Sequence, residues 1–214
     1  MWDTSALADR IIAACAQAEE ELRLEQAVYG LDARDEMALQ GFLSERLKES
    51  YEVAREVHYP STFGRKSTHR PRCDLVLTPK CRPLHLDTRL PTLFDPPDLC
   101  PPGQAMWLEV KVAFQFREGG QRHDGYGPQW RSAIVADLRK MEGDPLIAHA
   151  ALLLMVFNES AEILGKDLEL FGEILTREEV VAGARQVRSI PILDRIGHNV
   201  CTAALWPTIQ RAVS

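Results

Sequence analysis

The most informative stretch of the sequence is Met106-Trp-Leu-Glu-Val-Lys-Val-Ala-Phe-Gln-Phe116. Its apolar side chains, interrupted only at alternate positions, predict a β-strand. Successive residues of a strand point to opposite faces, so Glu109 and Lys111 share one face, while Leu108, Val110 and Val112 point the other way, into the core. The strand therefore places a carboxylate and an ammonium group side by side on one surface.

The segments on either side complete a sheet. Residues 51–58 alternate as a half-buried strand does, and residues 72–78 are short and apolar apart from Asp74. With the 106–116 strand they predict a three-stranded meander. Residues 129–141, with Trp130, Ile134 and Leu138 on one face, predict a helix that crosses over to an apolar strand at 149–157, which we expect to lie at the centre of the sheet.

Further helices are expected before and after this core in the sequence. Residues 4–28 predict an amphipathic helix capped by Thr4 or Ser5, and residues 33–50 predict a second one capped by Asp32. The remaining expected elements are a helix at 161–175, a short helix at 178–184 and an ambiguous tail at 187–213, with a last strand at 203–206.

A proline-rich segment separates two of the strands. Residues 79–104 contain seven prolines, a density that excludes regular helix and central strand. A long surface loop is expected there, either functional or simply a tolerated insertion. The length of 214 residues suits one domain, here 1–214, with residues 1–30 as an N-terminal helical extension.

Composition limits the class of protein. Hydrophobic residues make up 45% and charged residues 26%, which favours a packed core. The N-terminus resembles no secretory signal and no apolar run is long enough to cross a bilayer, so a cytoplasmic protein without membrane contact is expected. The net charge of −6 counts against nucleic-acid binding, although a basic stretch precedes Asp74: Arg65, Lys66, His69, Arg70 and Arg72.

The five cysteines do not form a recognisable framework. Their number is odd and no Cys-x-x-Cys pair is present, so a structural zinc site has little support. Cys81, His85 and Cys100 are the three residues that could meet around a metal. Unpaired, reduced thiols in a loop are the favoured interpretation.

Asp74 and Glu109 together predict a divalent-metal site. If their strands pair, the two carboxylates lie close together, and a cation relieves their repulsion. Mg²⁺ accepts two carboxylates and one backbone carbonyl, for which Val110 is well placed, and keeps several waters. A water made acidic by the ion can attack phosphorus, and Lys111 would orient it or stabilise the developing charge. The alternative is a surface ion pair on a strand, worth at most about 1 kcal/mol.

The order of these motifs resembles a known superfamily. Arg-Pro-Arg-Cys-Asp74-Leu-Val-Leu followed by Trp-Leu-Glu109-Val-Lys111-Val looks like the PD-(D/E)XK, or restriction-endonuclease-like, nucleases. The resemblance covers residues 32–157 and implies an α/β fold, an αβββαβ core with a mixed central sheet flanked by helices. To this core the chain adds an N-terminal helix and the proline-rich insertion. The resemblance also implies metal binding by Asp74 and Glu109 and catalysis by Lys111. Cys73 stands where the usual proline precedes the aspartate.

Many members of that superfamily add a glutamate from the first core helix. Glu36 precedes the apolar stripe of the second helix and matches the usual placement better than Glu45, and Glu56 on the first strand is an outside candidate. A solvated helix face is the common outcome for such glutamates. Asp137 and Lys140, three apart on a later helix, are expected to form an exposed ion pair rather than to contact phosphate.

Two functions follow from these expectations. The first is an Mg²⁺-dependent nuclease, with Mn²⁺ as a substitute ion, that hydrolyses phosphodiester bonds in DNA, using Asp74, Glu109, Lys111 and Glu36. The preference for DNA over RNA rests on the resemblance. The second is a catalytically inactive module of the same fold that binds protein or nucleic acid. The N-terminal helix is a candidate contact for a homodimer.

Overall fold

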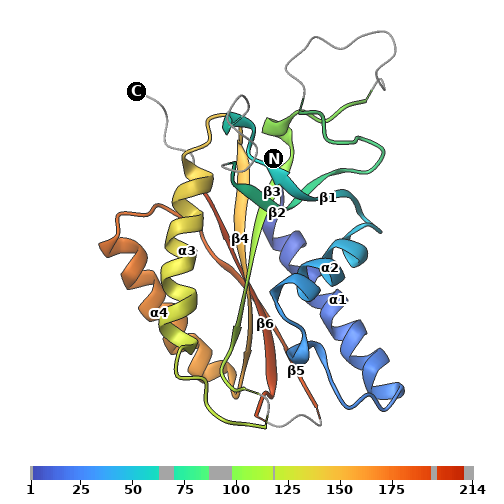
Figure 1. Cartoon of the computed structure of the whole chain (residues 1–214), viewed down its shortest axis with the longest axis vertical. Helices are drawn as coiled ribbons and strands as arrows, with labels where there is room; N and C mark the ends of the chain where they lie inside the picture. Colours follow the sequence, from blue (N-terminus) through green and yellow to red (C-terminus); the bar gives the residue numbers. More distant parts are fainter. Residues whose placement is uncertain (1, 63–69, 87–97, 118, 194–196, 210–214) are drawn as a thin grey trace.

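The chain forms a mixed β-sheet with helices on both faces (Figure 1). The structure is a computed structural model that describes residues 2–62, 70–86, 98–117, 119–193 and 197–209, without the side chains of residues 128–130. The helices are α1 (Thr4–Leu24), α2 (Glu36–Leu47), α3 (Tyr126–Glu142) and α4 (Ala161–Arg177), with short 3-10 turns at Leu31–Ala33, Pro60–Thr62 and Pro102–Gln104. The strands are β1 (Tyr51–His58), β2 (Arg72–Pro79), β3 (Met106–Phe114), β4 (His149–Asn158), β5 (Gln186–Pro191) and β6 (Val200–Pro207).

The strand order in the sheet is β1-β2-β3-β4-β6-β5. β1, β2 and β3 form the expected antiparallel meander, and β3 and β4 pair in parallel through the crossover helix α3. β4 is central, and its residues from Ala150 to Asn158 are buried. The predicted order of strands and helices from residue 51 to residue 158 is therefore confirmed. The predicted mixed sheet is also confirmed.

The two faces of the sheet carry different helices (Figure 1). α1 and α2 cover one face, where Leu7, Ile11 and Cys15 of α1 are fully buried with Ala203 and Leu205 of β6. α1 packs mainly against β5 and β6, so its apolar face covers the sheet of its own chain.

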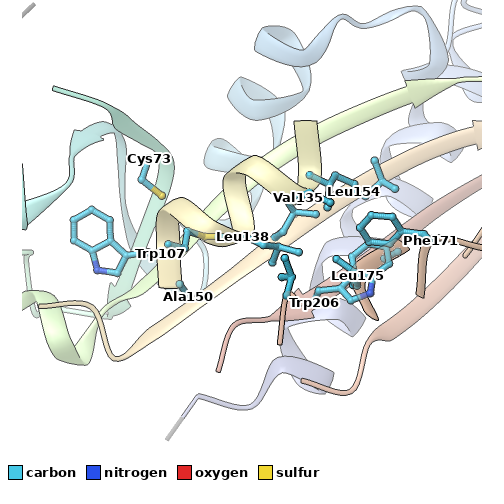
Figure 2. Close-up of a cluster of buried hydrophobic side chains, with 14 of the residues drawn as sticks. Cys73, Trp107, Val135, Leu138, Ala150, Leu154, Phe171, Leu175 and Trp206 are labelled. Atoms are coloured by element: carbon cyan, nitrogen blue, oxygen red, sulfur yellow. The ribbon is translucent and has the colours of Figure 1, made fainter. Parts of the chain in front are cut away.

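α3 and α4 cover the other face, over an apolar cluster shown in Figure 2. Leu138 of α3 and Phe171 of α4 point towards the strands, and the Phe171 ring meets the Trp206 ring edge-on at 5.2 Å between centroids. Trp107 of β3 lies fully buried at one end of this cluster. Burial of this large apolar surface favours the packing of α3 against β3 and β4, the strands it connects.

Several expected boundaries are wrong. Asp3, and not Thr4 or Ser5, caps α1, which ends at Leu24. Asp35, and not Asp32, caps α2, because its side chain accepts the amide hydrogen of Ala38 at 2.8 Å. Asp32 instead lies in a 3-10 turn, where its carboxylate bonds the ring of His198.

Two further expectations, one for the C-terminal end and one for the chain beyond β3, differ from the structure. Residues 178–184 form turns and one isolated bridge instead of a helix, and the ambiguous tail forms two strands, β5 and β6. The β3 strand ends at Phe114, and α3 begins at Tyr126 instead of at residue 129. The side chain of Trp130 lies outside the described residues, whereas Ile134 and Leu138 are buried as predicted.

The proline-rich segment is irregular where it is described. Leu84 and Cys100 form an isolated bridge, and Pro102 accepts a hydrogen bond from the Trp107 indole at 3.0 Å. Cys81 is exposed and Cys100 is buried. Within the described ranges, no group of three or more His, Cys, Asp or Glu side chains gathers as a metal site, so Cys81, His85 and Cys100 do not form one. No described helix has both the length and the apolar character to cross a membrane.

Candidate metal centre

Glu109 and Lys111 lie on the face of β3 that α3 covers. The neighbouring residues Leu108 and Val110 are fully buried on the opposite face with α1 and α2, as the strand period predicts. Glu109 is itself only 2% exposed, so it is not a surface group. The interpretation of Glu-x-Lys as a solvent-facing ion pair is therefore wrong, because α3 closes over this face of the strand.

Asp74 lies next to Glu109 at the point where β2 leaves β3. The last backbone pair of these strands is Leu75 with Leu108. Beyond it, the amide of Val110 donates to Asp74 Oδ2 at 2.7 Å. Because the N–H and C=O groups of a strand residue point to the same edge, the carbonyl of Val110 is directed to the same side as Asp74.

The strand around Asp74 is not regular. Cys73 packs in the cluster under α3 and α4, whereas Leu75 packs under α1 and α2. In a regular strand these two neighbours of Asp74 would share one face, so the alternation is broken here. Glu56 of β1 lies between the pairs Arg55–Leu75 and Val57–Cys73 and has a φ of 52°, so the strand geometry is disturbed at the level of Asp74.

Burial perturbs both carboxyl groups of the centre. Burial raises the pKa of Glu109 to about 7, although the neighbouring Lys140 ammonium acts in the opposite direction. Burial also raises the pKa of Asp74, against the hydrogen bond from the Val110 amide. The two carboxyl groups also act on each other: the contact with Glu109 lowers the pKa of Asp74, and the charge of Asp74 raises the pKa of Glu109.

Lys111 extends from β3 towards two carboxylates. Its Nζ lies 3.1 Å from Glu36 Oε1 and 3.6 Å from Asp137 Oδ2. The pKa of Lys111 is raised: burial alone would lower it, but the carboxylates of Glu36 and Asp137 outweigh burial. Glu36 is brought here because the Asp35 cap makes it the first residue of α2.

The other glutamates that the sequence suggested have surface partners. Glu45 pairs with Lys48 at 2.7 Å, and Glu56 pairs with Arg72 at 3.8 Å, in each case with about half or more of the side chain exposed. Of the three candidates, Glu36 is thus the one that joins Lys111. Arg65, Lys66 and His69 of the basic stretch lie outside the described residues.

Lys140 and Tyr59 complete the centre, and the sequence did not assign either of them to it. Lys140 Nζ lies 2.7 Å from Glu109 Oε1 and 2.8 Å from Asp137 Oδ1. The Tyr59 hydroxyl donates to the same Glu109 oxygen at 2.5 Å, and its ring stacks on Trp107. The predicted Asp137–Lys140 pair is present, but both side chains are largely buried, so the expectation of an exposed pair is wrong.

Sequence signals for these two residues were weak. The i, i+3 spacing revealed the Asp137–Lys140 pair but not the face of α3 that meets β3. Tyr59 follows a strand and precedes Pro60, which indicates only the end of that strand. Their contacts with Glu109 depend on where the chain after β1 and helix α3 lie relative to β3.

The donor set suits a hard divalent cation. Asp74, Glu109 and the Val110 carbonyl offer oxygen ligands, and Mg²⁺ usually binds through one or two carboxylates and retains several waters. Burial and the charge of Asp74 both raise the pKa of Glu109, and a cation bound between the two carboxylates would offset that repulsion. These residues therefore fit Mg²⁺ or Mn²⁺.

Comparisons with known proteins give no assignment. No model of a known protein family, no curated protein and no solved structure matches the chain significantly.

Proposed function

We propose that this chain is a magnesium-dependent nuclease of the PD-(D/E)XK type that hydrolyses phosphodiester bonds in DNA. The observation that carries the proposal is the adjacency of Asp74 and Glu109 on neighbouring strands, with Lys111 on the same face as Glu109. The order α2, β1 to β3, α3 and a parallel β4 supports the proposal, because the superfamily resemblance implies an αβββαβ core. The choice of DNA rests on the resemblance alone.

Each residue has a defined role in this proposal. Asp74, Glu109 and the Val110 carbonyl would hold the ion, which when bound makes water more acidic and withdraws charge from the phosphate. Lys111 lies on the same face and would stabilise the charge that develops on the phosphate oxygens or orient the attacking water. Glu36 holds the Lys111 ammonium in place at 3.1 Å and would orient it.

A cleavage assay with a matched pair of lysine variants tests this function. The wild-type chain is expected to cut plasmid and single-stranded DNA with Mg²⁺ and to be inactive with a chelator. Lys111→Ala is expected to lose at least about 10²-fold in rate, the usual effect of removing one transition-state donor. Lys48→Ala removes a surface lysine paired with Glu45 and should leave the rate unchanged.

Folding must be measured beside cleavage, because Lys111 lies between two carboxylates. Urea midpoints and circular dichroism show whether the variant remains folded. Metal-independent cleavage, or full activity in folded Lys111→Ala, would contradict the proposed mechanism. If the wild-type chain binds DNA or a protein but cuts neither DNA nor RNA, the inactive binding module is the better description.

A further inference from the structure

Lys140 is held at the centre by three groups from different parts of the chain. Its ammonium lies 2.7 Å from Glu109, 2.8 Å from Asp137 and 5.3 Å from the centroid of the Tyr59 ring. The side chain is 28% exposed. The positive charge is therefore fixed beside the buried carboxylate that the proposed metal site uses, on the α3 side of Glu109.

The ionisable groups around the centre carry a net negative charge when all of them are ionised. Among the residues that the structure describes, four carboxylates and two ammonium groups gather there: Glu36, Asp74, Glu109 and Asp137, with Lys111 and Lys140. With all six groups ionised, their formal charges sum to −2, which one divalent ion balances. A second divalent ion would bring the sum to +2, and two divalent ions close together repel each other.

We propose that the Lys140 ammonium takes the place on Glu109 that a second divalent ion would need, so that the chain binds one such ion. This inference rests on the proposed metal site at Asp74 and Glu109. Two-metal sites hold ions about 3.5–4 Å apart, commonly with a carboxylate between them. Here Glu109 Oε1 already accepts from Lys140 and from Tyr59, which leaves Oε2 of the carboxylate for the ion.

A simple structural ion pair is the alternative role for Lys140. Lys48 and Glu45 provide a matched comparison, because they have the same i, i+3 spacing on a helix and an Nζ–Oε1 distance of 2.7 Å, but lie on the surface. A purely structural Lys140 would change stability when replaced but not the number of ions bound. Stoichiometry therefore separates the two roles.

The test is a Mn²⁺ titration of the full chain, with free Mn²⁺ followed by electron paramagnetic resonance. We expect one ion per wild-type chain and one for Lys48→Gln. Lys140→Gln removes the charge but keeps a hydrogen-bond donor for Glu109, and it is expected to bind two ions. Lys140→Arg keeps the charge and should bind one.

The outcomes distinguish this inference from the function on which it rests. Two ions bound to the wild-type chain, or one ion bound to folded Lys140→Gln, would overturn the role of Lys140 and leave the metal site intact. If Lys140→Gln does not fold, two ions bound to the wild-type chain or to Lys140→Arg would still overturn the role of Lys140. No binding to the wild-type chain, or equal binding to Asp74→Asn, would overturn the metal site itself and this inference with it.

Discussion

Replacing Glu109 by Gln is expected to stabilise the metal-free protein above neutral pH. Glu109 is 2% exposed, and burial raises its pKa from an ordinary value of 4.5 to about 7. A carboxyl group whose pKa is higher in the folded state holds its proton more tightly there. Ionisation therefore opposes folding, with no cost below pH 4.5, a growing cost from pH 4.5 to 7, and a constant cost above pH 7.

The size of this effect follows from the same pKa. At about 1.4 kcal/mol for each pKa unit, the ionised Glu109 costs about 3 kcal/mol of folding free energy at pH 8 and about 1 kcal/mol at pH 5. Glu109→Gln removes the charge and keeps an acceptor for the Tyr59 hydroxyl and for Lys140, which also retains Asp137. Up to about 3 kcal/mol of stabilisation is therefore expected at pH 8.

Urea unfolding of the two proteins at pH 5 and pH 8, with a chelator present, measures the difference. For a chain of this size, a gain of 1 kcal/mol raises Tm by about 2–4 °C, so calorimetry should also detect it. Glu45→Gln changes an exposed glutamate and should shift stability by less than about 0.5 kcal/mol at both pH values. Equal or lower stability of Glu109→Gln at pH 8 would refute the argument that burial dominates at this carboxylate.

Three other substitutions test the surroundings of the centre. Tyr59→Phe removes the 2.5 Å hydrogen bond to Glu109 and should cost about 1.5–3 kcal/mol at pH 8 and less at pH 5, as urea midpoints at both pH values will show. Asp35→Ala removes the cap of α2 and should lower stability by about 1 kcal/mol; an unchanged urea midpoint would speak against this cap. Phe171→Ala should cost about 3–5 kcal/mol by urea unfolding, whereas the neighbouring Leu170→Ala, at an exposed position, should cost less than about 0.5 kcal/mol.

Local sequence patterns were sufficient to predict much of the sheet and the shared face of two site residues, Glu109 and Lys111. The period of a strand depends only on its own backbone, so the 106–116 stretch placed Glu109 and Lys111 on one face before any fold was known. The apolar run at 149–157 likewise predicted the buried central strand. The C-terminal tail was harder to predict, because β5 is half exposed and its apolar and polar residues alternate only weakly. β5 therefore becomes apparent only through its pairing with β6.

The remaining contacts of the centre depend on tertiary structure. Strand pairing placed Asp74 against the amide of Val110, at the level where the regular alternation of β2 is lost. The packing of α3 turned the Asp137–Lys140 pair inward, to Glu109 and Lys111. These contacts join residues distant in the sequence, and their geometry is set by which faces the elements bury. The sequence by itself therefore determined a carboxylate and an ammonium on one strand face, and the tertiary structure decided that this face is buried and shared with a second lysine.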